Sequence, residues 1–170
     1  MDSKVEKFAQ SLQHQFGARL EELRGEAHIY VRPDQIVAAL QLARNSHQFE
    51  LLSAMTVVDY WPQETPRFHV VYQLTSMANN VSAQLRVPVD ANSPSMPTAT
   101  GVYEVANWRE REIMEMFGIH FEGHPDPRPL MLPPETKDHP LRRDVPLGYE
   151  EPQFTFNFDE IDVRKPYAKE

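Results

Sequence analysis

Two histidines and a glutamate lie at alternate positions in the C-terminal half of the chain. His120, Glu122 and His124 are spaced by two, so an extended backbone would direct their side chains to one side. Two imidazoles and one carboxylate can form a facial metal triad. A stand-alone metal-dependent enzyme is therefore one hypothesis. Gly123 and Pro125 favour the alternative, a strand or loop leaving a helix with His124 fixing a turn, because both residues interrupt regular strands.

The residues before this cluster predict a helix over 102–117. At 100° per residue, its apolar side chains fall on one broad arc made by Val105, Ala106, Trp108, Ile113, Met116 and Phe117. Arg109 and Glu112 fall inside the arc three residues apart, so we expect them to pair and to be buried or to lie at an interface. Arg111 and Glu115 are four residues apart, and we expect them to pair at the edge or on the outer face of the helix.

Composition excludes several classes of function. Lys and Arg total 17 against 25 Asp and Glu, a net charge of −8, which argues against nucleic acid as a partner. The chain has no cysteine, so it cannot ligate iron–sulfur clusters through thiolates or form disulfides. It has only 6 glycines and lacks the glycine-rich motifs that bind phosphates. No apolar stretch approaches the length of a membrane span.

Residues 1–124 predict a compact domain of the α+β class. Apolar residues at helical spacing indicate helices over 5–16 and 33–43, in addition to the one that Gly118 caps. Four β-rich runs indicate strands over 28–31, 55–60, 68–74 and 81–87. The last two runs flank a polar turn and so predict a hairpin, and a loop follows over 88–100. We expect two layers, a small mixed or antiparallel sheet packed against helices.

Residues 125–170 predict an extended C-terminal arm. Nine of the 15 prolines lie there, too many for long helices or central strands. Charge-assisted hydrogen bonds are available from Arg142, Arg143 and Asp144. An alternating row in an extended segment places three rings on one face: Phe154, Phe156 and Phe158. We expect this row to dock on partner subunits. The alternatives are a strand that covers the domain's own sheet and a disordered tail, which three phenylalanines disfavour.

Two segments of the chain resemble a known signature. The first segment contains residues 110–112, 115–119 and 121–126, which in that order are similar to the pattern of the C (30-kilodalton) subunit of NADH–quinone oxidoreductase, which is respiratory complex I. In that pattern Glu115 fills the acidic position, His124 the histidine and Arg128 the basic position. Residues 139–144 resemble the second characteristic segment of the same family.

The resemblance implies a scaffold subunit with no cofactor and no catalysis of its own. FMN and iron–sulfur clusters would lie in partner subunits of the peripheral arm of the complex. The chain would pack beside the D (49-kilodalton) subunit at the quinone site, near subunits such as B and I, on the cytoplasmic face of the cell membrane. The complex would oxidise NADH, reduce quinone and translocate protons. The rival within this class is the equivalent subunit of a membrane-bound hydrogenase or of a complex with another electron donor.

Structural or interface roles follow from the same resemblance, and no catalytic or cofactor-binding residue is expected. Arg109 and Glu112 would fix the signature helix. His124 and Arg128 would direct the exit of the arm. The remaining contacts with neighbouring subunits are expected from Glu110, Arg111, Glu115, Arg142, Arg143 and Asp144.

Overall fold

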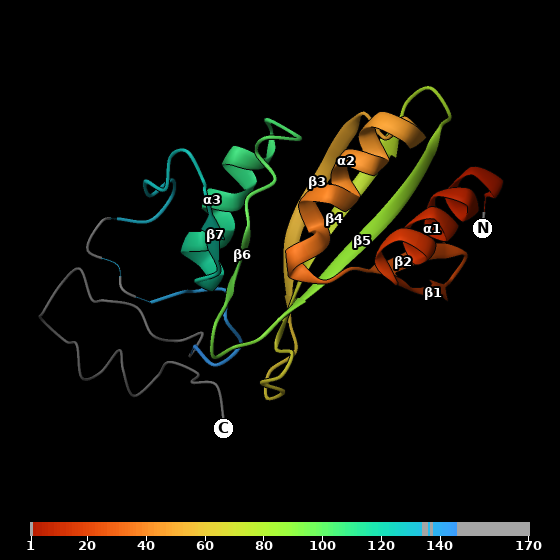
Figure 1. The fold of residues 1–170 in the computed structure, drawn as a ribbon. Coiled ribbons are helices and arrows are strands. Elements are labelled where there is room, and N and C mark those ends of the chain that lie inside the picture. Colours follow the sequence, from red (N-terminus) through yellow and green to blue (C-terminus); the bar gives the residue numbers. More distant parts are fainter. Residues whose placement is uncertain (1, 134–135, 137, 146–170) are drawn as a thin grey trace, which may run out of the picture.

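The chain folds around a mixed five-stranded sheet (Figure 1). The computed structural model describes residues 2–133, 136 and 138–145. The strand order is β1-β2-β5-β4-β3, and every neighbouring pair is antiparallel except β2 and β5. The strands are β1 (Arg19–Leu23), β2 (Glu26–Tyr30), β3 (Leu51–Asp59), β4 (Phe68–Ser76) and β5 (Val81–Val89).

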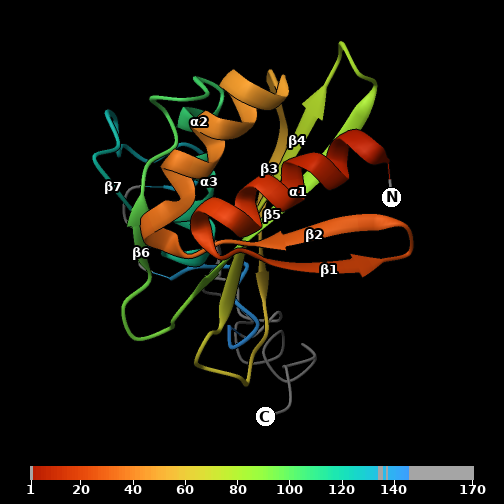
Figure 2. The ribbon, with the colours of Figure 1, turned by 45° about the vertical axis from the view of Figure 1, so that its right-hand side comes forward.

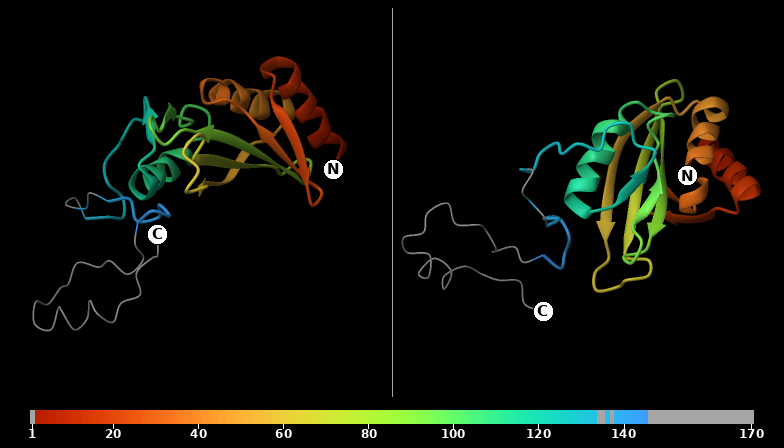
Figure 3. Two further views of the ribbon diagram at one scale, coloured as in Figure 1. Left: turned by 90° about the horizontal axis from the view of Figure 1, so that it is seen from below. Right: turned by 60° about the vertical axis from the view of Figure 1, so that its left-hand side comes forward.

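Helices pack against this sheet and make the second layer (Figures 2 and 3). In the described part of the chain they are α1 (Ser3–Phe16), α2 (Ile36–His47), which follows a short 3-10 turn η1 (Pro33–Gln35), and α3 (Ala106–Phe117). α1 starts where the Asp2 side chain accepts a 2.8 Å hydrogen bond from the Lys4 N–H, and it ends at Gly17 in the left-handed conformation. α1 and α2 contact each other, whereas α3 lies beside β3.

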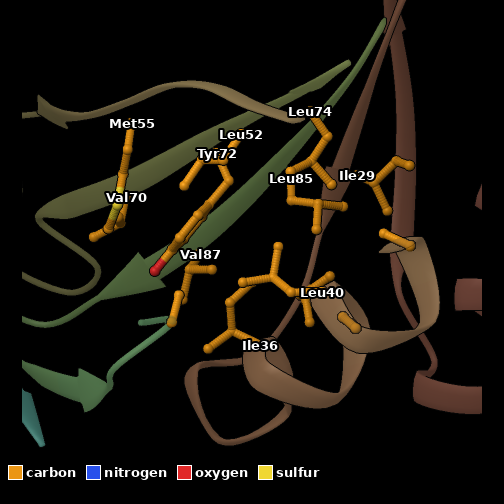
Figure 4. Close-up of a cluster of buried hydrophobic side chains, with 14 of the residues drawn as sticks. Ile29, Ile36, Leu40, Leu52, Met55, Val70, Tyr72, Leu74, Leu85 and Val87 are labelled. Carbon is orange, nitrogen blue, oxygen red and sulfur yellow. The ribbon is translucent and has the colours of Figure 1, made fainter. Parts of the chain in front are cut away.

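Alternating side chains of two strands build the core. The even-numbered residues of β4 and the odd-numbered residues of β5 from Ala83 onward are buried beneath the helices, because successive residues of a strand face opposite sides. A bulge in β3 between Leu52 and Ala54 keeps its apolar residues on the same side. Figure 4 shows Tyr72, Leu74 and Leu85 of the sheet facing Leu40 of α2.

The α+β class and the β4–β5 hairpin are confirmed, and each misplaced element has a local cause. β1 was not predicted because none of its residues is buried, so it carries no apolar alternation. The predicted loop over 88–100 contains a short strand, β6 (Ser95–Pro97), which pairs in parallel with β7 (His120–Glu122). α3 begins at residue 106 instead of 102, because Val102 and Tyr103 are buried in turns, where the Tyr103 hydroxyl donates to the Phe49 carbonyl at 2.6 Å.

Gly118 closes α3 at a point where another part of the chain comes very close. Its φ is +70°, which favours glycine. A Cβ at this position would overlap the His139 imidazole and lie 2.5 Å from the Arg142 guanidinium. Residues of the predicted arm therefore pack directly on the end of α3.

Replacing Gly118 by alanine is expected to cost more than the same change at the cap of α1. Gly17→Ala is the matched control, because its φ is +65° and no atom lies within 4 Å of the added methyl. We expect Gly17→Ala to lower the free energy of unfolding by about 1 kcal/mol. Gly118→Ala should lower it by roughly 2–4 kcal/mol, since it also displaces packed side chains. Urea denaturation measures both, and equal losses would contradict close packing of the arm.

Candidate functional site

The buried face of α3 differs from the face predicted from the sequence. Its buried residues are Ala106, Glu110, Arg111, Ile113, Met116 and Phe117. Arg109 and Glu112 pair as predicted, at 3.5 Å. Their side chains are 46% and 39% exposed, so the prediction of their burial is wrong within this chain. Trp108 and Val105 misled the prediction, because both are apolar and yet exposed. An interface role for Arg109 and Glu112 stays a prediction.

Glu110 is the acid that α3 buries completely. Its carboxylate accepts a hydrogen bond from the Thr98 hydroxyl at 2.5 Å and another from the Ala99 N–H at 2.7 Å. Burial raises the pKa of Glu110 to about 7, against the lowering effect of these two hydrogen bonds. The acid therefore holds the loop after β6 onto the helix while remaining titratable near neutral pH.

His124 lies against Glu110 and has almost no contact with solvent. Its side chain is 1% exposed, and its Nε2 is 3.8 Å from a carboxylate oxygen of Glu110. Nδ1 accepts a 3.1 Å hydrogen bond from the Asp126 N–H, so in the neutral ring the proton is on Nε2, which faces the Asn107 carbonyl at 3.2 Å. His124 thus fixes the turn at which the chain leaves β7.

The structure does not bring the predicted metal triad together. His120 and Glu122 are exposed on β7, and Glu122 accepts a 2.7 Å hydrogen bond from the Ser95 hydroxyl. Gly123 has a φ of +79° and turns the chain, which sends His124 to Glu110 instead. No group of three metal-ligating side chains occurs among the residues that the structure describes. The metal-enzyme hypothesis therefore loses its ligand set.

Arg111 points toward the first residues of the arm and not outward as predicted. Its Nε donates to the Arg128 carbonyl at 2.8 Å and one of its terminal nitrogens to the Pro129 carbonyl at 3.0 Å. It also lies 3.6 Å from Asp126, which makes a bidentate pair with the exposed Arg128 side chain. That pair, through the Arg128 hydrogen bonds, lowers the pKa of Asp126 to about 2.

Glu115 holds the arm one turn further along the helix. Its two carboxylate oxygens accept hydrogen bonds from the N–H groups of Leu130 and Met131, the second at 2.9 Å. The predicted pair between Arg111 and Glu115 does not form, because both side chains bind the backbone of the arm. The two residues bind carbonyls and amides respectively, so they clamp residues 128–131 in one orientation.

The end of α3 is capped by the second segment of the predicted signature. The last carbonyls of a helix lack partners within the helix. Here His139 Nδ1 donates to the Glu115 carbonyl at 2.7 Å, the Leu141 N–H to the Met116 carbonyl at 3.2 Å, and Arg142 Nε to the Phe117 carbonyl at 2.6 Å. Burial, aided by the charge of Arg67, lowers the pKa of Arg142.

A buried ion network that the sequence did not predict ties this segment to the sheet. Arg67 makes bidentate pairs with Asp59, at 2.9 Å for both bonds, and with Asp144, at 3.1 and 2.6 Å. The side chains of Arg67 and Asp59 are 5% and 2% exposed. Asp59 also accepts from the N–H groups of Trp61 and Arg143. The available signal was a lone aspartate and a lone arginine at facing ends of two β-rich runs.

Asp59 and Asp144 remain ionised because of Arg67. Burial acts to raise the pKa of Asp59, but hydrogen bonds from Arg67 and from two backbone N–H groups outweigh it and lower the pKa overall. The Arg67 hydrogen bonds also lower the pKa of Asp144. Arg143 extends outward to the Trp61 carbonyl at 3.3 Å. The predicted phenylalanine row, Phe154, Phe156 and Phe158, lies outside the described residues.

Comparison with known proteins identifies clear sequence relatives. Residues 29–151 match the family model described as the 30 Kd subunit of respiratory-chain NADH dehydrogenase. The C subunit of NADH-quinone oxidoreductase from Roseiflexus sp. (strain RS-1) is 46% identical over 151 residues, which are 88% of this chain and 86% of that one. Its counterpart from Herpetosiphon aurantiacus is 38% identical over 154 residues, 89% of this chain and 90% of the relative.

Two solved structures share the fold. A trypsin-resistant fragment (1-134) of Nqo5 superposes with a TM-score of 0.65 at 29% identity, covering 72% of this chain and 98% of the fragment. A chain of the membrane-bound sulfane sulfur reductase, an archaeal respiratory membrane complex, gives a TM-score of 0.63 at 28% identity, covering 83% of this chain and 81% of the other.

Replacing Arg67, at the centre of the ion network, should destabilise the fold more than replacing Asp144, at its edge. Arg67→Met leaves Asp59 buried without a cation, and we expect it to lower the free energy of unfolding by roughly 3–5 kcal/mol. Asp144→Asn keeps the Arg67–Asp59 pair, so its cost should be only about 1–3 kcal/mol. Urea denaturation gives these values, and amide exchange at Leu141 should report release of the arm in Asp144→Asn. Equal costs for the two variants would contradict a network centred on Arg67.

Proposed function

The chain belongs to the family of the 30-kilodalton subunit of respiratory-chain NADH dehydrogenase, and from that premise we propose that it is a cofactor-free scaffold in the peripheral arm of a proton-translocating NADH–quinone oxidoreductase. Its place would be beside the D (49-kilodalton) subunit, which forms the quinone site, with B and I as further neighbours. As part of an oxidoreductase it would contribute to catalysis by positioning other subunits and not by chemistry of its own.

The proposal rests on one observation: three side chains from the two signature segments bind the backbone of this same chain. Arg111, Glu115 and Arg142 all bind backbone atoms where the arm meets α3. None of these three contacts prepares a side chain to bind substrate; each fixes the path of the chain. Such contacts would serve assembly, because they fix residues 125–133 and 138–145 against the domain and leave the exposed side chains of this segment available to a partner.

Exposed apolar side chains along this path supply a surface for the partner. Trp108 is 58% exposed, Met131 63% and Leu141 54%, and all three lie on α3 or on the arm that it holds. Aromatic and methionine side chains are enriched in protein interfaces. We propose that this surface is covered by the D subunit, with Arg109 and Glu112 as polar contacts at its rim.

Location and cofactors follow from membership of the complex. No helix in the described part of the chain has the length and apolar character needed to cross a membrane. We propose a peripheral position on the cytoplasmic face of the cell membrane, reached through partner subunits. FMN and the iron–sulfur clusters would be bound by those partners, because this chain has no cysteine to ligate a cluster.

A second candidate within the same class is favoured by one structural relative. The sulfane sulfur reductase chain shares the fold over 83% of this chain, and it comes from an archaeal respiratory membrane complex. The same fold therefore occurs in a complex that is named for another reaction. Nothing in the residues described above selects the electron donor, since donor chemistry would lie in other subunits.

Affinity purification from native membranes separates the two candidates. A tagged copy of the chain should bring down a flavin-containing, NADH-oxidising subunit together with iron–sulfur subunits, identified by mass spectrometry. NADH–quinone reductase activity should co-purify in a fixed ratio to the chain. A stable complex with a hydrogenase or sulfur-reducing partner, and without an NADH-oxidising subunit, would support the second candidate instead.

Ending the chain after Val145 is expected to spare the domain and impair assembly. The residues lost, 146–170, include the alternating phenylalanines, each of which could contribute about 1.5–3 kcal/mol if buried against a partner. The truncated chain should unfold at nearly the same temperature as the full chain. It should retain much less D subunit on purification.

The triple substitution Phe154→Ser, Phe156→Ser, Phe158→Ser in the full-length chain is the matched control, because it keeps the length of the arm. It should reproduce most of the assembly defect if the rings dock on a partner. Normal assembly of the truncated chain would refute a partner-binding arm.

A further inference from the structure

We propose that Glu110 and His124 form a buried proton-binding site whose occupancy controls how firmly the loop after β6 and the root of the arm are held on α3. The site is internal to this chain, so it does not depend on the identity of the partner subunits. The burial of Glu110, its distance to His124 and the hydrogen bonds that its carboxylate accepts support this site.

Neither member of the pair can exchange a proton with water directly. Glu110 is fully buried and the His124 side chain is 1% exposed. Their nearest atoms are 3.8 Å apart, too far for a hydrogen bond and close enough for each to sense the charge of the other. A proton on the Glu110 carboxyl group lets the site avoid an uncompensated buried charge. Without that proton, the site contains a buried carboxylate.

The remaining groups around Glu110 do not compensate that charge. The loop after β6 supplies only two donors, the Thr98 hydroxyl and the Ala99 N–H. From β4, Tyr72 points a fully buried hydroxyl into this region, and that hydroxyl has no hydrogen-bond partner among the described residues. Burial and the charge of Glu110 both raise the pKa of Tyr72, so its hydroxyl remains protonated.

The nearest full charges belong to other contacts. On α3, Arg111 follows Glu110 directly, but its guanidinium turns to the arm, where Asp126 lies 3.6 Å away. Asp126 is paired in turn with Arg128. Asn107, on the same helix, offers His124 a carbonyl and no charge. Within the part of the chain that the structure describes, no fixed cation therefore sits in the site, which makes the proton the compensating charge.

The direction of the pH effect follows from burial of the acid. The pKa of Glu110 in the folded chain is about 7, above the ordinary value of 4.5 that it would regain in an opened state exposed to water. A group whose folded pKa is raised stabilises the closed state fully below its ordinary pKa, and that stabilisation is lost as pH rises through the folded pKa. Opening should therefore increase between pH 5 and 8.

The opening would reach the arm through His124. Its Nδ1 accepts the Asp126 N–H, two residues before the carbonyl of Arg128 that Arg111 binds. An ionised Glu110 is stabilised by access to water, which requires the residues that cover it, His124 among them, to separate from α3. That separation would break the first of these contacts and strain the second. Proton release at the pair is thus linked to loosening of the point from which the arm leaves the domain.

Amide hydrogen exchange of the full chain tests the proposal. The reporters are the Ala99 and Asp126 amides, and their rates are corrected for the intrinsic pH dependence of exchange. The opening equilibrium should rise roughly 50-fold from pH 5 to pH 8 in the natural sequence. Glu110→Gln should reduce the rise to about twofold or less, because an amide does not titrate. Glu112→Gln is the matched control on the exposed side of the same helix and should behave as the natural sequence does.

A second measurement keeps the test decisive if Glu110→Gln fails to fold. The carbon-13 shift of the Glu110 carboxyl carbon in the natural sequence should titrate near pH 7. His120→Gln, which alters an exposed histidine nearby, should leave this titration curve unchanged. Titration of Glu110 near pH 4.5, or an unchanged pH dependence in Glu110→Gln, would overturn the proposal.

Discussion

Arg67 joins the sheet to the described part of the C-terminal arm. It binds Asp59 at the end of β3 and Asp144 in the arm, each through two hydrogen bonds, from a position almost closed to solvent. Removing the charges of Arg67 and Asp59 from water is costly, and bidentate geometry offsets the loss. Asp144, whose side chain is 33% exposed, joins the network from the surface. The rings of Trp61 and Phe68 lie 4.8 and 4.9 Å from the guanidinium and restrict it further. The network therefore fixes position more than it adds stability.

Because Arg67 fixes Asp144, the residues just before it are brought to the end of α3. Helices need partners for their last carbonyls, and α3 obtains them from His139, Leu141 and Arg142. Gly118 permits this approach, since any side chain there would collide with the arm. The domain and the described part of the arm thus depend on each other: α3 ends where it does because the arm caps it, and the arm follows its path because α3 has free carbonyls.

The class of the fold followed from sequence patterns wherever one side of an element is buried. The β4–β5 hairpin and α1 show clear periodicity, and both were placed correctly. β1 lies at the edge with no buried residue, so periodicity could not detect it. The ion network was invisible for a different reason. Arg67 and Asp144 are 77 residues apart in the sequence, and no local pattern records a long-range pair.

The error on α3 shows why signature residues are poorly assigned from one helix alone. An arc of apolar residues assumes that apolar means buried in the same chain. Here Trp108 faces outward while Glu110 and Arg111 face inward, because the acid and the base have backbone partners in loops that a helical wheel does not contain. Within this chain, the inward-facing charges hold the arm in place, and the exposed Trp108 has no such role. This inversion agrees with the proposed scaffold function, in which the exposed aromatic side chain would contact a partner subunit.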